Sequence, residues 1–351
     1  MNPPGRAAGG RFAISILLIL AIMLVATVLL AISIGAAGIS FHRLLAAIGL
    51  AAGDAGQIDR DRLILLSIRL PRILLSLLVG GLLALAGAVM QGLFRNPLAD
   101  PALVGVSGGA ALAAAAIIVI GDSLAAGYIA SAIGISVAAF FGAMLTTAML
   151  YMLATHNRRT SIAAFLLAGI AIAALGNAGI GTLVFAADDR QLRDVTFWML
   201  GSLAGATWVK VGAVGAFFAL SMVLAEVISR GLDLFALGEA DARYAGVDVE
   251  VVKRLSTILI AAAVGAAVSV SGIIGFVGIV VPHILRLLIG PGHRLLLPAS
   301  VLAGAILLAL ADCIARTAVA PAELPVGIVT ALVGAPFFLW LLLKQRVLGA
   351  S

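Results

Sequence analysis

A polar insert at residues 229–254 carries charged side chains between two long apolar stretches. It contains two runs, 231–238 and 239–246, that each end in glycine, and this pattern favours two short helices. A short helix with a charged face can pass a rigid-body displacement from a soluble protein to membrane helices, provided that the contact is firm. The alternative is an amphipathic helix that lies on the membrane surface.

Motifs for catalysis are absent from the sequence. It has no Gly-Lys pair, so it lacks the phosphate-binding loop GxxxxGK[ST] and cannot hydrolyse ATP by that route. It also lacks His-Glu-x-x-His and Cys-x-x-Cys motifs, and its one cysteine, Cys313, excludes an internal disulfide. The four histidines are scattered over different loops and helix ends: His42, His156, His283 and His293. We therefore expect no enzyme and no metal site.

Three arginines, Arg69, Arg72 and Arg316, precede or follow apolar spans and could bind anionic groups. A guanidinium group stays charged and can hold a carboxylate through two hydrogen bonds. They could bind another protein, anchor helices at the membrane interface, or pair within the chain. Internal pairing is plausible for Arg316, because Asp312 stands four residues earlier on the same helix face.

The elements that position these residues are membrane helices. Apolar residues make up 63% of the 351 residues and charged residues 11%, which is incompatible with an ordinary water-facing surface. Uncharged runs of roughly 20 to 30 residues recur along the chain. We therefore expect an all-α polytopic membrane protein with a single domain, 1–351. The net charge of +6 fits membrane orientation, and no basic stripe with interleaved aromatics indicates nucleic-acid binding.

The apolar runs predict ten transmembrane helices. Their expected ranges are 12–41, 73–94, 102–121, 124–155, 160–187, 209–228, 255–271, 273–282, 295–315 and 324–343. Residues 41–69 should lie outside with a short surface helix, and 197–208 should form a short helix and turn at the interface. Ten spans place both termini on one side, and the excess of positive charge there predicts the cytoplasm. That excess is modest, because several arginines fall on the outer side.

The turn between the second and third expected spans runs from Arg95 to Pro101. Its two prolines prevent a continuous helix and leave backbone polar groups that need a partner or water. An ordered polar turn at a membrane face indicates a gate or a docking surface.

Several strings of the chain resemble one family. They are RLPR at 69–72, GAVMQGLF at 87–94, NPLADP at 96–101, GVS at 105–107 and GFVGIVVPHILR at 275–286. Together they are similar to the FecCD-type permeases, the type II ABC importers of ferric siderophores, heme and cobalamin. The resemblance covers nearly the whole chain from Arg69 onward. It implies the type II importer permease fold, a homodimer, two separate ATP-binding cassette subunits and a periplasmic binding protein, in the bacterial inner membrane.

The resemblance also implies roles for individual residues. The predicted ATPase-coupling residues are Leu237, Gly238, Glu239, Asp241, Ala242, Arg243, Ala245, Gly246 and Val247. Arg69, Arg72 and Arg316 resemble the basic patch that docks the binding protein. Asn96, Leu98, Thr160 and Ser161 match the cytoplasmic gate, with ordinary turn chemistry or helix capping as the alternative. The family's fifth and tenth helices line the passage, which corresponds here to 160–187 and 324–343.

The expected cargo is heme, because the strings at 188–194 and 196–208 look most like the heme-importing branch. Ferric siderophore is the second candidate and cobalamin the third. We expect no permanently bound cofactor. A different class, the ion-coupled secondary transporter, would need a carboxylate relay in the membrane, for which Glu226 and Asp312 are the candidates.

Overall fold

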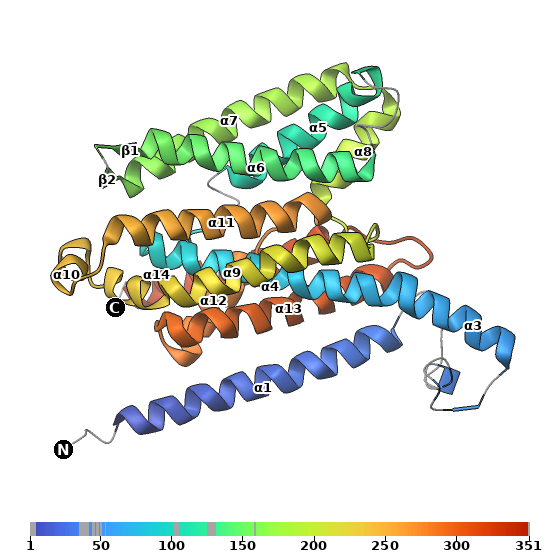
Figure 1. The fold of residues 1–351 in the computed structure, drawn as a ribbon, viewed down its shortest axis with the longest axis horizontal. Helices are drawn as coiled ribbons and strands as arrows, with labels where there is room; N and C mark the ends of the chain where they lie inside the picture. Colours follow the sequence, from blue (N-terminus) through green and yellow to red (C-terminus); the bar gives the residue numbers. More distant parts are fainter. Residues whose placement is uncertain are drawn as a thin grey trace.

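The computed structural model describes residues 5–34, 42, 43, 46, 49, 51, 52, 54–101, 105–124, 131–157 and 159–349. The described chain is almost entirely helical (Figure 1). Its helices are α1 (Gly5–Ser33), α3 (Ala55–Ile64), the π-helical turn η1 (Leu65–Arg69), α4 (Leu70–Phe94), α5 (Val106–Leu124), α6 (Ala132–Ala154), α7 (Ile162–Ala186), α8 (Asp189–Leu200), α9 (Trp208–Phe235), α10 (Glu239–Tyr244), α11 (Val249–Ser271), α12 (Val277–Ile289), α13 (His293–Thr317) and α14 (Val326–Gly349). A two-residue hairpin, β1 (Thr155–His156) and β2 (Arg159–Thr160), joins α6 to α7.

Helix α4 forms the centre of the bundle. It packs against α9, α11, α12 and α13, and nearly all of its side chains are buried. Such complete burial requires small residues, because helices approach closely only where side chains are short. A Cβ atom on Gly80 would overlap the Gly304 carbonyl of α13, and one on Gly87 would overlap Gly278 of α12. The glycines of α4 therefore set how closely its neighbours pack.

Helices α5, α6, α7 and α8 form a second group beside this centre (Figure 1). Large apolar side chains of α7 point away from the chain, including Leu175 and Phe185, which are 72% and 93% exposed. Exposed apolar surface of this extent requires lipid or another protein to cover it. Leu332 and Leu339 of α14 are also exposed, so the outward faces of α7 and α14 are surfaces of contact within a membrane or an assembly.

Seven helices of the described chain are long and apolar enough to cross a membrane, and three shorter apolar helices accompany them. The seven are Ile14–Ser33, Gly56–Phe94, Ala132–Ala154, Ile162–Ala186, Trp208–Phe235, Val249–Ser271 and His293–Thr317. The shorter ones are Val106–Gly121, Val277–Ile289 and Val326–Trp340. The all-α membrane class is therefore confirmed. Parts of the expected boundaries, at 35–41, 102–104 and 125–130, lie outside the described residues.

Several predicted boundaries were wrong because helices continue beyond their apolar stretches. The span expected to stop at residue 228 runs on as α9 to Phe235, so 231–238 does not form a separate short helix. The span expected from residue 255 begins as α11 at Val249, where Asp248 caps its first turn. The surface helix expected within 41–69 is α3, and it continues through η1 into α4 without a break.

Candidate functional site

Helix α10 and its flanking turns lie at one extremity of the bundle, together with the β1–β2 hairpin (Figure 1). We call this extremity the α10 end. Gly238 precedes the helix with φ +130° and Gly246 follows it with φ +82°, conformations that L side chains rarely adopt. Glu239 and Asp241 in the first turn favour the helix N-terminus electrostatically. The sequence therefore correctly predicted a short helix at 239–246.

The nine predicted coupling residues occupy this one turn-helix-turn unit. Ala242 is fully buried and holds the helix to the bundle, and the amide of Val247 donates to the Ala242 carbonyl at 3.0 Å. Leu237 and Tyr244 project outward, with 69% and 91% of their surfaces exposed. The unit thus combines a fixed inner face with an apolar and charged outer face, which is the arrangement that a docking element requires.

A buried lysine of α11, Lys253, ties this unit to the rest of the bundle. Its Nζ lies 2.9 Å from Glu239 Oε1 of α10 and 3.2 Å from Glu250 Oε1 of α11. It also donates to the Thr160 carbonyl at 2.8 Å, and only 2% of the residue is exposed. Arg243 Nη2 lies 3.8 Å from Glu239 Oε2 and also 3.8 Å from Glu250 Oε1. We call Glu239, Arg243, Glu250 and Lys253 the lysine cluster.

The sequence reasoning missed Lys253 and Glu250, although one signal was present. Lys253 stands three residues after Glu250 at the start of an apolar helix, which is a spacing that brings side chains together. A lysine within a buried helical stretch needs a partner, because an unpaired buried charge is costly.

One predicted gate residue, Thr160, bonds to this cluster, and a second, Ser161, follows it in the chain. The Thr160 amide donates to Glu250 Oε2 at 3.1 Å, and its hydroxyl lies 3.0 Å from that of Thr155 across the hairpin. Ser161 is the N-cap of α7 and accepts a hydrogen bond from the Ala164 amide at 3.3 Å. Capping, the alternative given for Ser161, is therefore present, and the gate role stays a prediction.

The other predicted gate residues, Asn96 and Leu98, lie in the turn after α4. Asn96 Oδ1 accepts from the Leu98 amide at 3.0 Å, which stabilises the turn locally. The turn approaches the start of α7 through the rings of Phe94 and Phe165, whose centroids are 5.8 Å apart. The two gate segments are therefore neighbours, as a common role requires.

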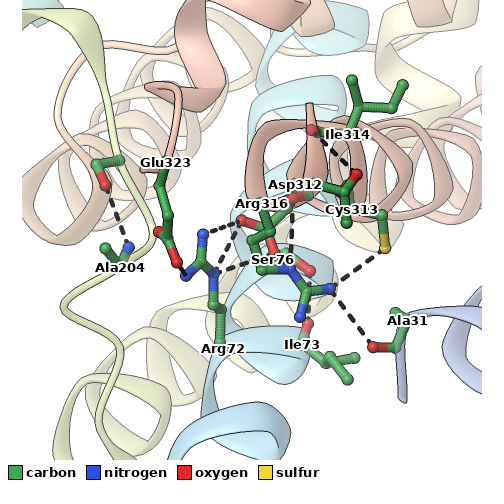
Figure 2. A network of polar contacts seen from close by, with 12 residues as sticks. Ala31, Arg72, Ile73, Ser76, Ala204, Asp312, Cys313, Ile314, Arg316 and Glu323 are labelled. Atoms are coloured by element: carbon green, nitrogen blue, oxygen red, sulfur yellow. Dashed lines mark hydrogen bonds and ion pairs between the residues drawn. The ribbon is translucent and has the colours of Figure 1, made fainter. Parts of the chain in front are cut away.

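A second ionic group connects α4 with α13 and with the segment before α14 (Figure 2). Arg72 Nη2 lies 2.9 Å from Asp312 Oδ1, and Arg72 Nη1 lies 2.9 Å from Glu323 Oε2. Asp312 Oδ2 lies 3.1 Å from Arg316 Nε, one helical turn further on. We call Arg72, Asp312, Arg316 and Glu323 the arginine cluster.

The predicted docking arginines are not an accessible patch in this structure. Arg69, Arg72 and Arg316 are only 4%, 7% and 5% exposed. Arg72 pairs with both Asp312 and Glu323, and Arg316 pairs with Asp312. Arg69 donates to the Ile32 carbonyl of α1. The structure thus shows the internal pairing that was the alternative for Arg316, and shows the same for Arg72. Docking of a binding protein remains a prediction.

The histidines do not gather into a metal site. Within the described part of the chain, no three side chains of His, Cys, Asp or Glu lie close enough to hold a metal ion. His293 instead pairs with Asp233 of α9: its amide donates to Asp233 Oδ1 at 2.7 Å, and its Nδ1 lies 2.7 Å from the same oxygen. His283 is buried and faces Phe337 of α14 at 6.4 Å between ring centroids.

Comparison with known proteins gives a consistent result. The model of the FecCD transport family matches residues 22–344. A hemin transport system permease protein of Yersinia pestis is 44% identical, over 94% of this chain and 96% of the relative. A cobalamin import system permease protein of Halobacterium salinarum is 43% identical, over 83% of this chain and 76% of the relative.

A solved structure agrees with these sequence relatives. It is described as an inward-facing conformation of a metal-chelate type ABC transporter, and it superposes with a TM-score of 0.81 at 33% identity. The superposition covers 94% of this chain and 99% of that one.

Proposed function

The chain belongs to the FecCD transport family, and from that premise we propose that it imports heme as the permease subunit of an ATP-driven transporter. The observation that carries the choice of heme is the match to the hemin permease, which extends over nearly all of both chains. Cobalamin is the second candidate, because the cobalamin permease has nearly the same sequence identity to this chain, 43% against 44%, over a shorter part of it. A ferric siderophore is the third.

The proposal includes ten membrane spans with both termini in the cytoplasm. The seven long helices and the three shorter apolar ones together supply that number. Helix α14 continues to Gly349, so its full length is 24 residues, and both α12 and α14 contain an internal proline, which removes a backbone hydrogen bond. In this topology the α10 end faces the cytoplasm, and the inner membrane of a bacterium is the expected location.

The exposed face of α10 supports the proposal that an ATP-binding cassette subunit docks there. Leu237 and Tyr244 offer apolar contact area, and Glu239, Asp241 and Arg243 offer charges around it. Because the chain has no phosphate-binding loop of its own, ATP hydrolysis resides in those separate subunits. A second copy of this chain would cover the exposed apolar faces of α7 and α14, so that the passage lies between the copies.

Ion-coupled transport finds little support in the two candidate carboxylates. Asp312 lies 2.9 Å from Arg72 and 3.1 Å from Arg316, so its neighbours are two permanent cations and not groups that could pass a proton on. Glu226 is exposed near the α10 end of α9. Alternating access driven by partner subunits therefore remains the better description.

Uptake into proteoliposomes tests this proposal. The permease is reconstituted with its ATPase subunits, and uptake of heme, a ferric siderophore and cobalamin is compared, each delivered by its own binding protein. We expect ATP-dependent uptake of heme alone, and no uptake with an ATPase subunit that cannot hydrolyse ATP. Uptake of another cargo would contradict heme as the substrate. Uphill transport without ATPase subunits would contradict the class of ATP-driven importer.

A further inference from the structure

We propose that Lys253 is a positioning residue that fastens α10 to the start of α7, so that a displacement of α10 moves Thr160. This inference rests on the proposed function, in which α10 receives the push of the ATPase subunit. It assigns a role to Lys253 and Glu250, two residues of α11 that lie behind the docking surface.

The backbone of Thr160 is held on both sides by α11. Its carbonyl accepts from Lys253 Nζ at 2.8 Å, and its amide donates to Glu250 Oε2 at 3.1 Å. Both bonds involve a charged group, and such bonds are stronger than those between neutral groups. Two side chains of α11 therefore bind both backbone polar groups of Thr160, a residue of β2.

The same lysine makes the contact with α10. Glu239 Oε1, in the first turn of α10, lies 2.9 Å from Lys253 Nζ. An ammonium group has three N–H donors, and here three oxygen acceptors surround it: Glu239 Oε1, Glu250 Oε1 and the Thr160 carbonyl. Each donor has one acceptor, so α10 cannot move away from Thr160 without breaking a charged contact.

Thr160 is in turn joined directly to α7. The next residue, Ser161, caps that helix, and the following turn places Phe165 against Phe94 of α4. The ring centroid of Phe235, at the end of α9, lies 6.0 Å from Lys253 Nζ and 5.8 Å from Arg95 Cζ. Both predicted gate segments thus border the group that holds α10.

Substitution of Lys253 separates this role from simple stability. Lys253→Met keeps an unbranched side chain that is one heavy atom shorter, and it removes the ammonium group that binds Glu239, Glu250 and the Thr160 carbonyl. The double variant Lys253→Met/Glu250→Gln removes one of those carboxylates and should recover stability lost to unpaired charge. The matched control is Lys210→Met, the same change in the first turn of α9 at the opposite extremity of the bundle.

Each variant is reconstituted with the ATPase subunits and the binding protein, and assembly, ATP hydrolysis and uptake are measured on the same sample. We expect both Lys253 variants to assemble and hydrolyse ATP while uptake per ATP falls at least tenfold. Stimulation of hydrolysis by the loaded binding protein should also disappear. The Lys210→Met control should keep the native ratio.

Three results would overturn the inference. Unchanged uptake per ATP in Lys253→Met shows that the contact transmits nothing. An equal fall of hydrolysis and uptake, or failure of both Lys253 variants to assemble, shows a structural role only. Failure of the proposed function looks different, because the unmodified complex itself would then show no ATP-dependent uptake.

Discussion

The two ionic clusters of this protein differ in how far they are closed to water. In the arginine cluster the central carboxylate, Asp312, is 1% exposed and two guanidinium groups hold it. In the lysine cluster the ammonium is buried, but the side chains of Glu239 and Glu250 are 37% and 21% exposed. One cluster has a buried anion between cations, and the other has a buried cation between anions that reach solvent.

This difference indicates different mechanical roles. Opening a buried ion pair leaves charges without water, which costs several kcal/mol, whereas carboxylates at a surface can exchange a partner for solvent at small cost. The arginine cluster is therefore suited to fix α4 and α13 relative to each other. The lysine cluster contributes less to the stability of the fold, and it is suited to join α10 to Thr160 in a part of the molecule that moves as a unit during transport. Four variants test this contrast, in order of decreasing effect on stability.

Removing the central carboxylate should have the largest effect. Asp312→Asn leaves Arg72 and Arg316 buried beside a neutral amide, and we expect a loss of about 3–5 kcal/mol, the range for breaking a buried pair. Thermal unfolding in detergent measures this. Asp194→Asn, at an exposed pair with Arg190 of 4.0 Å, is the control and should change little. A small effect at Asp312 would mean that the cluster does not hold the bundle.

Adding a methyl group between α4 and α13 should have the next largest effect. Gly80→Ala forces the two backbones apart at Gly304, and overpacking of this kind costs about 1–3 kcal/mol. The same unfolding measurement applies. At Gly108 of α5 an added Cβ meets nothing within 4 Å, so Gly108→Ala is the matched control. Equal stability of both variants would contradict a rigid α4–α13 contact.

Loss of the hydroxyl bridge in the hairpin should have a moderate effect. Thr155→Val removes the 3.0 Å contact with the Thr160 hydroxyl at constant shape, and a hydrogen bond of this kind contributes about 1 kcal/mol. Thr182→Val serves for comparison, because the Thr182 hydroxyl donates to the Ala178 carbonyl of its own helix. A loss as large as that expected for Asp312→Asn would place the α10 end among the rigid parts.

A double variant of α10 should have the smallest effect on stability of the four, and a large effect on transport. Glu239→Gln/Arg243→Gln disrupts partly exposed ion pairs, and we expect a change in stability below about 1 kcal/mol. Uptake in proteoliposomes should nevertheless fall, because α10 loses its charged contact with Lys253 and the charges of its docking face. Unchanged uptake at a normal rate of ATP hydrolysis would contradict the coupling role of α10 and the contrast drawn between the two clusters.

The sequence predicted the class of fold and the short helix at α10, because apolar runs and glycine punctuation are local signals. It failed where polar residues continue a helix. Ser229 and Arg230 extend α9 beyond its apolar stretch, since polar side chains at a helix end can reach water while the backbone stays helical. It also could not show that Arg72 is occupied, because Asp312 is 240 residues away in the chain.

The continuous helix from Gly56 to Phe94 has a further consequence for the side of the protein opposite α10. Its 39 residues correspond to about 58 Å, nearly twice the ~30 Å thickness of membrane hydrocarbon. Its first turns, with Asp59, Arg60 and Arg62, therefore project beyond the hydrocarbon of the membrane. A protein that approaches from that side meets this charged rod well before it reaches the level of Arg72.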